Sequence, residues 1–251
     1  INLHNLYIYS SLKNETQYQR NFNKKCEKKF CNIIGTIRMH RLYLANSLYD
    51  HNYHRFGYTS CIPILINGNQ ILPCHAGVPY IPNIYKTYKK LSHTFTTADH
   101  NILNKEDTAG ISKSPLSWFS NSYFHIVNES FFSDISPNNE LFITEKTYKP
   151  IFHTIPFIVN GCAGTLAYLR KRGFETFPEI FNENYDKEPN AEKRMHLIIQ
   201  EIKKACGDPN LHQKVYSCQK KLIHNKNLLL DQYNACLLYT SDAADEEDSV
   251  D

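Results

Sequence analysis

The stretch NELFITEKTYKPIFHTIPFIVNG, residues 139–161, joins a charged Thr-Glu-Lys triplet to an apolar segment. Its end, PFIVNG at 156–161, is a short apolar run between a proline and a glycine, which is typical of a strand buried inside a parallel sheet. Before it, Thr144 stands where a helix N-cap is expected and Glu145 falls in the first helical turn. A helix followed by a buried strand is the repeating unit of an α/β domain.

The segments on either side continue this alternation. Strands are expected at 28–34, 61–68 and 122–130, and helices at 41–52, 164–173, 191–206 and about 210–230. Pro150 shortens or bends the helix that begins at Thr144. Residues 73–118 show no clear period and are expected to be an irregular insertion. The sequence therefore predicts an α/β fold, a Rossmann-like parallel sheet with flanking helices.

The two ends of the chain differ from this pattern. We expect residues 1–24 to be the end of an upstream domain or a linker. In the last 16 residues, CLLYTSDAADEEDSVD, six of the final ten are acidic. They resemble the translation of a sequencing-library adapter, so we expect 236–251 to be a non-native, disordered read-through tail. A genuine disordered acidic tail is the alternative.

The charge of the chain favours an anionic ligand. The tail holds six of the 25 acidic residues and none of the 28 Lys and Arg, which leaves 19 acidic residues in the rest. Such a surplus suits a nucleotide diphosphate, a nucleic acid or an anionic surface. No segment approaches the roughly 20 apolar residues of a membrane span.

Metal and disulfide chemistry receive little support from the sequence. The eight cysteines contain no Cys-x-x-Cys pair and no Cys/His group at zinc spacing. Buried free thiols are the favoured interpretation, although disulfides remain possible. An Asp-x-Asp metal motif is not evident.

Two places combine a strand end with a cationic helix start. In GTIRMHR (35–41), Arg38 and Arg41 arrive after a strand and a glycine, where a guanidinium could hold a phosphate. The second place is the Thr-Glu-Lys triplet. Capping alone explains Thr144 and Glu145, but Lys146 in a first turn opposes the helix dipole unless an anion lies beside it.

A family resemblance rests on YFHIVNES at 123–130 followed by FITEKTYKPIFHTIPFIVNG at 142–161. These residues resemble the nucleotide-sugar-binding half of α1,3-fucosyltransferase-type glycosyltransferases. GTLAYLRKRGFETF at 164–177 is also similar to an element of viral and marine microbial glycosyltransferase-like proteins. The resemblance covers about 120–180 well and 28–61 loosely. It implies a GT-B architecture in which 25–235 form the C-terminal, donor-binding domain.

The resemblance also implies roles for individual residues. Glu145 would bind the ribose hydroxyls, Lys146 would neutralise the diphosphate, and Arg38 or Arg41 would supply a second phosphate cation. The implied partners are a nucleotide sugar, with GDP-fucose as first guess, and the hydroxyl of a glycan or another acceptor. The implied reaction is inverting and needs no metal or other cofactor, because the cations stabilise the leaving group.

The chain departs from the family pattern at three points. Phe142 replaces the usual tyrosine and keeps only its stacking face. HIVNES differs from the family's Phe-Glu-Asn-Ser, so Glu129 and Ser130 receive no role. The general base lies in the family's N-terminal domain, so we expect it upstream of this fragment.

A different class remains open, a non-catalytic nucleic-acid or polyanion-binding module. The 17 Tyr and 14 Phe could stack bases between cations. These aromatics lie mainly within apolar runs, where core packing is expected. A nucleic acid is therefore the less favoured partner.

Overall fold

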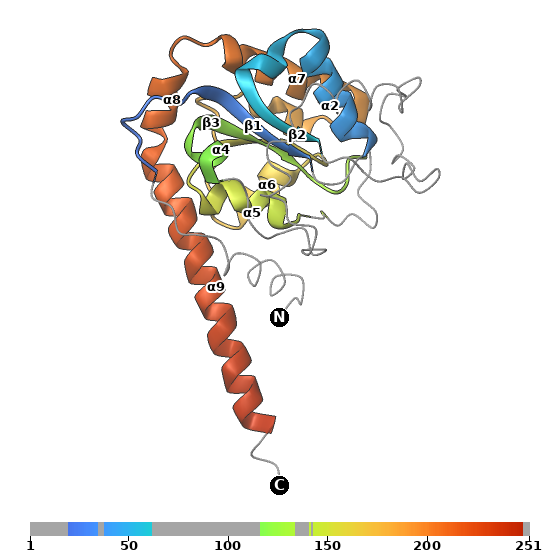
Figure 1. Cartoon of the computed structure of the whole chain (residues 1–251). Helices are drawn as coiled ribbons and strands as arrows, with labels where there is room; N and C mark the ends of the chain where they lie inside the picture. The colour runs from blue at the N-terminus through green and yellow to red at the C-terminus, as the bar shows by residue number, and fades with distance from the viewer. Residues whose placement is uncertain (1–19, 35–37, 62–115, 134–140, 142, 248–251) are drawn as a thin grey trace.

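The computed structural model describes residues 20–34, 38–61, 116–133, 141 and 143–247 (Figure 1). Four parallel strands form one sheet in the order β2-β1-β3-β4. Their bounds are β1 Lys28–Ile34, β2 Gly57–Cys61, β3 Ser122–Asn128 and β4 Phe157–Asn160. The chain is therefore α/β with a Rossmann-like parallel sheet, as predicted.

Helices precede and follow these strands along the chain. Their bounds are α2 Met39–Asp50, η1 Tyr53–Phe56, α4 Leu116–Ser120, α5 Glu145–Phe152, α6 Thr165–Lys171, η3 Glu183–Lys187, α7 Ala191–Gly207, α8 Leu211–Ser217 and α9 Gln219–Glu247. Within the described residues, none of them is long and apolar enough to cross a membrane. The predicted insertion at 73–118 lies outside the described residues except for its last three.

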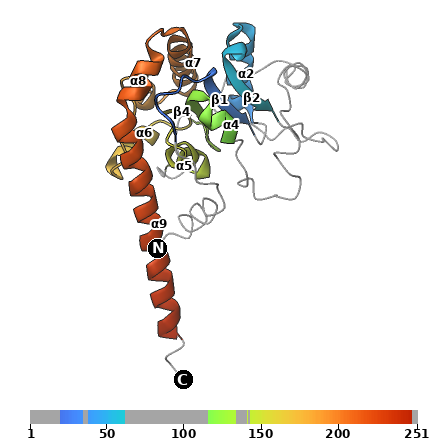
Figure 2. The same cartoon turned by 60° about the vertical axis from the view of Figure 1, so that its left-hand side comes forward.

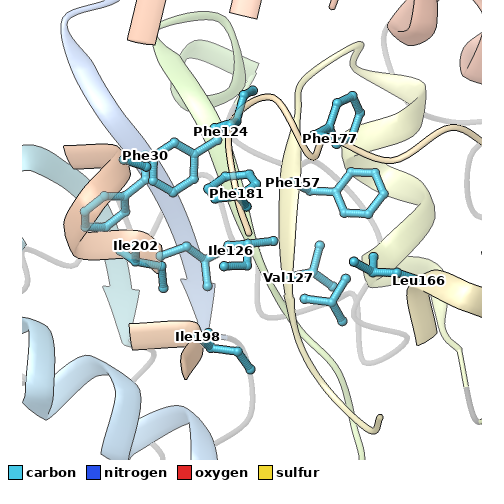
Figure 3. Packing of buried hydrophobic residues seen from close by; sticks show 14 of the residues in the cluster. Phe30, Phe124, Ile126, Val127, Phe157, Leu166, Phe177, Phe181, Ile198 and Ile202 are labelled. Atoms are coloured by element: carbon cyan, nitrogen blue, oxygen red, sulfur yellow. The ribbon is translucent and has the colours of Figure 1, made fainter. Parts of the chain in front are cut away.

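The core lies on both faces of the sheet and is centred on β3. All seven residues of β3 are buried, as expected for an inner strand covered on two sides. Figure 3 shows Phe30, Phe124 and Phe181 packed together, with Ile198 and Ile202 of α7 beside them. Helices α4 and α5 contact β3, and α5 also packs against α9.

Two sequence expectations about the elements need correction. The second strand is β2, Gly57–Cys61, and lies earlier than the predicted 61–68, whose remainder is outside the described residues. Helix α6 begins at Thr165, and its N-cap is Gly164, whose left-handed φ of 83° is a conformation that glycine adopts without strain. The helix predicted at 210–230 is two helices, since α8 ends before Cys218.

The end of the chain also differs from its prediction. Residues 236–247, expected to be disordered, continue α9. This segment contains leucine and alanine and neither proline nor glycine, so a helix already formed at Gln219 can propagate through it. The first part of α9 lies against the body, and its later part extends away from the other labelled elements (Figures 1 and 2).

Candidate functional site

The order of the strands fixes where a ligand is expected. From β1 the chain moves to β2 on one side, and later returns to place β3 on the other side of β1. The carboxyl ends of β1 and β3 are therefore the topological switch point, where open parallel sheets bind their ligands. Helix α2 begins shortly after β1 and α5 follows β3, so both predicted cationic places belong to this edge.

The first turn of α5 carries the Thr-Glu-Lys triplet. Thr144 is the N-cap, and its Oγ1 accepts a hydrogen bond from the Lys146 backbone N–H at 3.4 Å. Lys146 Nζ lies 2.6 Å from Glu145 Oε1 and 3.3 Å from Thr144 Oγ1. The Lys146 side chain is 32% exposed and that of Glu145 12%. The predicted cap is confirmed, and the cation that capping does not explain is held beside an acid.

The side chain of Glu129, the residue directly after β3, hydrogen-bonds to the first turn of α5. Its side chain is buried, and its Oε1 accepts from the Thr144 N–H at 3.1 Å and from Thr147 Oγ1 at 2.6 Å. Its Oε2 accepts from Thr144 Oγ1 at 2.6 Å and from the Ser130 N–H at 3.2 Å. Four hydrogen bonds therefore lock the carboxylate to the start of α5, where the helix dipole also favours a negative charge.

The backbone of Glu129 holds the start of α2 in the same way. Its carbonyl oxygen accepts from Arg41 Nη2 at 2.8 Å and from His40 Nε2 at 2.9 Å. The His40 ring stacks on Phe132, with 5.4 Å between the ring centroids. One residue thus joins both predicted cationic places.

The two arginines of α2 differ in what they can reach. Arg41 is 2% exposed, and burial lowers its pKa to about 10, helped by the neighbouring Arg38 and opposed by Glu129 and Glu145. It is still charged at neutral pH. Arg38 occupies the N-cap position and is half-buried as a whole, although its Nε is buried and makes no hydrogen bond to another described residue. The geometry therefore makes Arg38 the more accessible guanidinium.

A row of buried asparagines supports this edge from within the sheet. Asn160 Nδ2 donates to Asn128 Oδ1 at 3.0 Å, and Asn128 Nδ2 donates to Asn32 Oδ1 at 2.6 Å. The backbone oxygen of Asn160 also accepts from the Glu129 N–H at 3.1 Å. The ends of β1, β3 and β4 are thereby tied together just below Glu129, in an interior where such hydrogen bonds are strong.

Arg194 of α7 closes the loops that follow β3 and β4. Its guanidinium, 1% exposed, donates to the carbonyls of Gly161 at 3.1 Å and Ser133 at 2.7 Å. It also donates to the carbonyls of Glu188 and Pro189, and lies 4.6 Å from the Phe132 ring centroid. This arginine acts as a structural clamp because its donors point at backbone oxygens.

The start of α6 holds a carboxylate of the protein itself. Asp186 accepts from the backbone N–H groups of Leu166 at 2.9 Å and Ala167 at 3.0 Å. Burial raises the pKa of this carboxyl, and these two backbone donors oppose the rise. The donors of α6 that a phosphate would use are therefore taken, which leaves the α2 and α5 starts as the cationic part of the edge.

The sequence thus placed Thr144, Glu145, Lys146, Arg38 and Arg41 at one edge. Phe142 lies outside the described residues. What the sequence missed is the set of buried residues that hold the edge together, Glu129, His40, Thr147, Asp186 and Arg194. The signal for Glu129 was a charged residue directly after the strand-like run SYFHIVN, where a carboxylate needs buried partners.

Fold and edge together define a Rossmann-like α/β domain whose switch point carries a carboxylate, an ammonium and a guanidinium. In comparisons with known proteins, no family model matches the chain. No curated protein and no solved structure matches it either.

Proposed function

We propose that this chain is the donor-binding domain of an inverting GT-B glycosyltransferase of the α1,3-fucosyltransferase-like type. Its substrate is a nucleoside-diphosphate sugar, with GDP-fucose as the first candidate, and its acceptor is a hydroxyl group. The observation that carries the proposal is the convergence of Arg38, Glu145 and Lys146 at the switch point of the sheet. The resemblance of 123–130 and 142–161 to that family supports it.

The chemistry of the Glu145–Lys146 pair suits such a donor. A carboxylate accepts hydrogen bonds from the two adjacent hydroxyls of a ribose, and an ammonium binds a diphosphate as a point charge. When the donor binds, the 2.6 Å ion pair between Lys146 and Glu145 is replaced by contacts of Lys146 with the diphosphate and of Glu145 with the ribose. Each charged group therefore keeps a partner. The desolvation of two unpaired charges, which is costly, is thereby avoided.

Sugar transfer builds negative charge on the departing diphosphate. Lys146 and Arg38 would stabilise that charge, and Arg41 would contribute through its buried charge while it holds the Glu129 carbonyl. Fixed cations lower the barrier most when they need no rearrangement during the reaction. The four hydrogen bonds on the Glu129 carboxylate supply this rigidity for the first turn of α5.

The test is calorimetric titration of the full chain with GDP, UDP and ADP. We expect one of them to bind selectively, and Lys146→Ala to weaken that binding about tenfold to a hundredfold, as the loss of a charge-assisted contact should. Lys171→Ala removes the same charge from an exposed position on α6 and should leave the affinity unchanged. Equal binding by both variants would contradict the assignment of Lys146.

The ribose contact has its own test. If GDP is the ligand, 2′-deoxy-GDP should bind the wild-type chain about tenfold more weakly than GDP. Glu145→Ala should bind GDP and 2′-deoxy-GDP equally, because the partner of the hydroxyl is gone. A deoxy effect that persists in Glu145→Ala would show that another residue reads the ribose.

A further inference from the structure

The amino-terminal edge of the sheet, opposite the candidate site, gathers basic side chains from separate segments. β1 begins there, η1 leads directly into β2 there, and α7 ends there in contact with η1 (Figure 1). Because the strands are parallel, all their starts meet at this one edge. We call the resulting surface the basic edge: Lys24, Lys25, Lys28, Lys29, Arg55 and Lys203.

The cations of the basic edge outnumber the acidic side chains that lie near them. None of its six cations forms an ion pair with another described residue. The acids near these segments are Glu27, which accepts from the Tyr58 hydroxyl, Asp50 at the end of α2, and Glu201 and Asp208 at the end of α7. Lys214 lowers the pKa of Asp208, and the charge of Lys29 also helps to lower it. Lys204 and Lys214, which lie nearby, pair with acids and are therefore not included.

Three lysines of the basic edge are held over tyrosine rings. Lys28 Nζ lies 5.9 Å from the ring centroid of Tyr58, Lys29 Nζ lies 5.7 Å from that of Tyr123, and Lys203 Nζ lies 5.8 Å from that of Tyr53. Such cation–π contacts position an ammonium group without cancelling its charge. The positive field of this edge is therefore fixed in place.

One aromatic side chain of the same edge is exposed. Phe56, the last residue of η1, is 41% exposed and packs on Tyr53 with 5.8 Å between the ring centroids. The exposed Arg55 precedes it, and Lys28 Nζ donates to the Arg55 carbonyl at 3.1 Å. An exposed phenylalanine thus follows directly on Arg55, whose carbonyl binds Lys28.

We propose that the basic edge docks the domain on an anionic lipid surface, with the cations at the headgroups and Phe56 inserted at the interface. Lys and Arg near such a surface each raise the affinity about fivefold, and an apolar ring adds to this by leaving water. A single-stranded nucleic acid fits less well, because it needs successive open rings for stacking. Here the tyrosine rings are engaged by lysines.

The experiment measures co-sedimentation of the full chain with vesicles. We expect binding to phosphatidylcholine vesicles that contain phosphatidylserine, no binding to phosphatidylcholine alone, and release of the bound chain by high salt. The triple variant Lys28→Glu, Arg55→Glu, Lys203→Glu should bind at least tenfold more weakly. The control with the same charge change at exposed positions elsewhere is Lys171→Glu, Lys187→Glu, Lys193→Glu.

Insertion of Phe56 is tested by fluorescence. The one native tryptophan, Trp118, is buried, so Phe56→Trp adds an exposed reporter at this edge. Its emission should shift to the blue with phosphatidylserine vesicles, whereas that of Ile223→Trp, a similarly exposed position on α9 (43%, against 41% for Phe56), should not.

Three outcomes would overturn the proposal. They are no vesicle binding by the wild-type chain at low salt, equal loss of binding in the control triple variant, and binding of a single-stranded oligonucleotide without binding of vesicles. Because the lipid readouts use no nucleotide, they stand apart from the test of the donor site.

Discussion

Replacement of the Glu129 carboxylate by an amide, Glu129→Gln, tests whether this residue organises the candidate site. The shape is preserved, so no cavity forms. If the new NH₂ group takes the place of Oε1 it faces the Thr144 N–H, and if it takes the place of Oε2 it faces the Ser130 N–H. In either orientation the new NH₂ group faces one backbone N–H and one threonine hydroxyl, both of which are donors. The backbone N–H then has no acceptor.

The loss of these charge-assisted hydrogen bonds should lower the free energy of unfolding by about 2–3 kcal/mol. For a domain of this size that corresponds to a fall in Tm of about 5–10 °C. Urea unfolding followed by circular dichroism measures the change. Hydrogen exchange at the Thr144 amide should accelerate more than exchange in α7, since only the first turn of α5 loses its acceptor.

Glu188→Gln is the matched control. Its carboxylate accepts one exposed hydrogen bond, from the Asn190 N–H at 3.0 Å, so the same chemical change should cost less than about 0.5 kcal/mol. If Glu129→Gln unfolds at the same urea concentration as the wild type, the four hydrogen bonds do not hold the first turn of α5. The structural argument for a rigid site would then be refuted.

Two further predictions concern buried groups. Burial lowers the pKa of His125 to about 3, helped by the Lys149 charge, so only the unfolded chain takes up this proton as the pH falls through about 6.5. Between pH 7 and pH 5 the wild type should therefore lose about 2 kcal/mol more stability than His125→Gln. Parallel stability curves for the two proteins would contradict this. Arg194→Met should lower the free energy of unfolding by about 3 kcal/mol or more, because four backbone carbonyls lose a charged donor. The control Arg172→Met, which removes hydrogen bonds to part-buried side chains, should lower it by less than about 1 kcal/mol. Equal urea midpoints for the two variants would show that the Arg194 hydrogen bonds do not stabilise the fold.

The elements that the sequence predicted correctly are those with a local cause. β1, β3 and β4 are apolar runs next to turn residues, and α7 has a clear stripe of apolar residues, so their bounds follow from neighbouring side chains. Thr144 was recognised as a cap for the same reason. β2 was misplaced because Gly57–Cys61 is mostly polar and becomes a strand only by pairing with β1.

The candidate site depends on contacts between residues far apart in the sequence. Arg41 and Glu129 are 88 positions apart, and no local pattern indicates that the carbonyl of one receives the guanidinium of the other. The sequence therefore treated Arg38 and Arg41 as equivalent, whereas the pairing of β1 with β3 buries Arg41 and leaves Arg38 at the surface of the edge. Only the strand order could decide between them.

Glu129 also shows why stability and the site are difficult to separate in this domain. Its backbone N–H bonds to β4, its carbonyl to α2 and its carboxylate to α5, so one residue sets the distance between the cations of two helices. A substitution there changes the fold and the site together. The side chains of Lys146 and Arg38 do not hold the core together in this way, since that of Lys146 is 32% exposed and Arg38 is half-buried. Changes at these two positions should therefore alter ligand binding while the domain stays folded, which makes them the positions where function can be tested separately from stability.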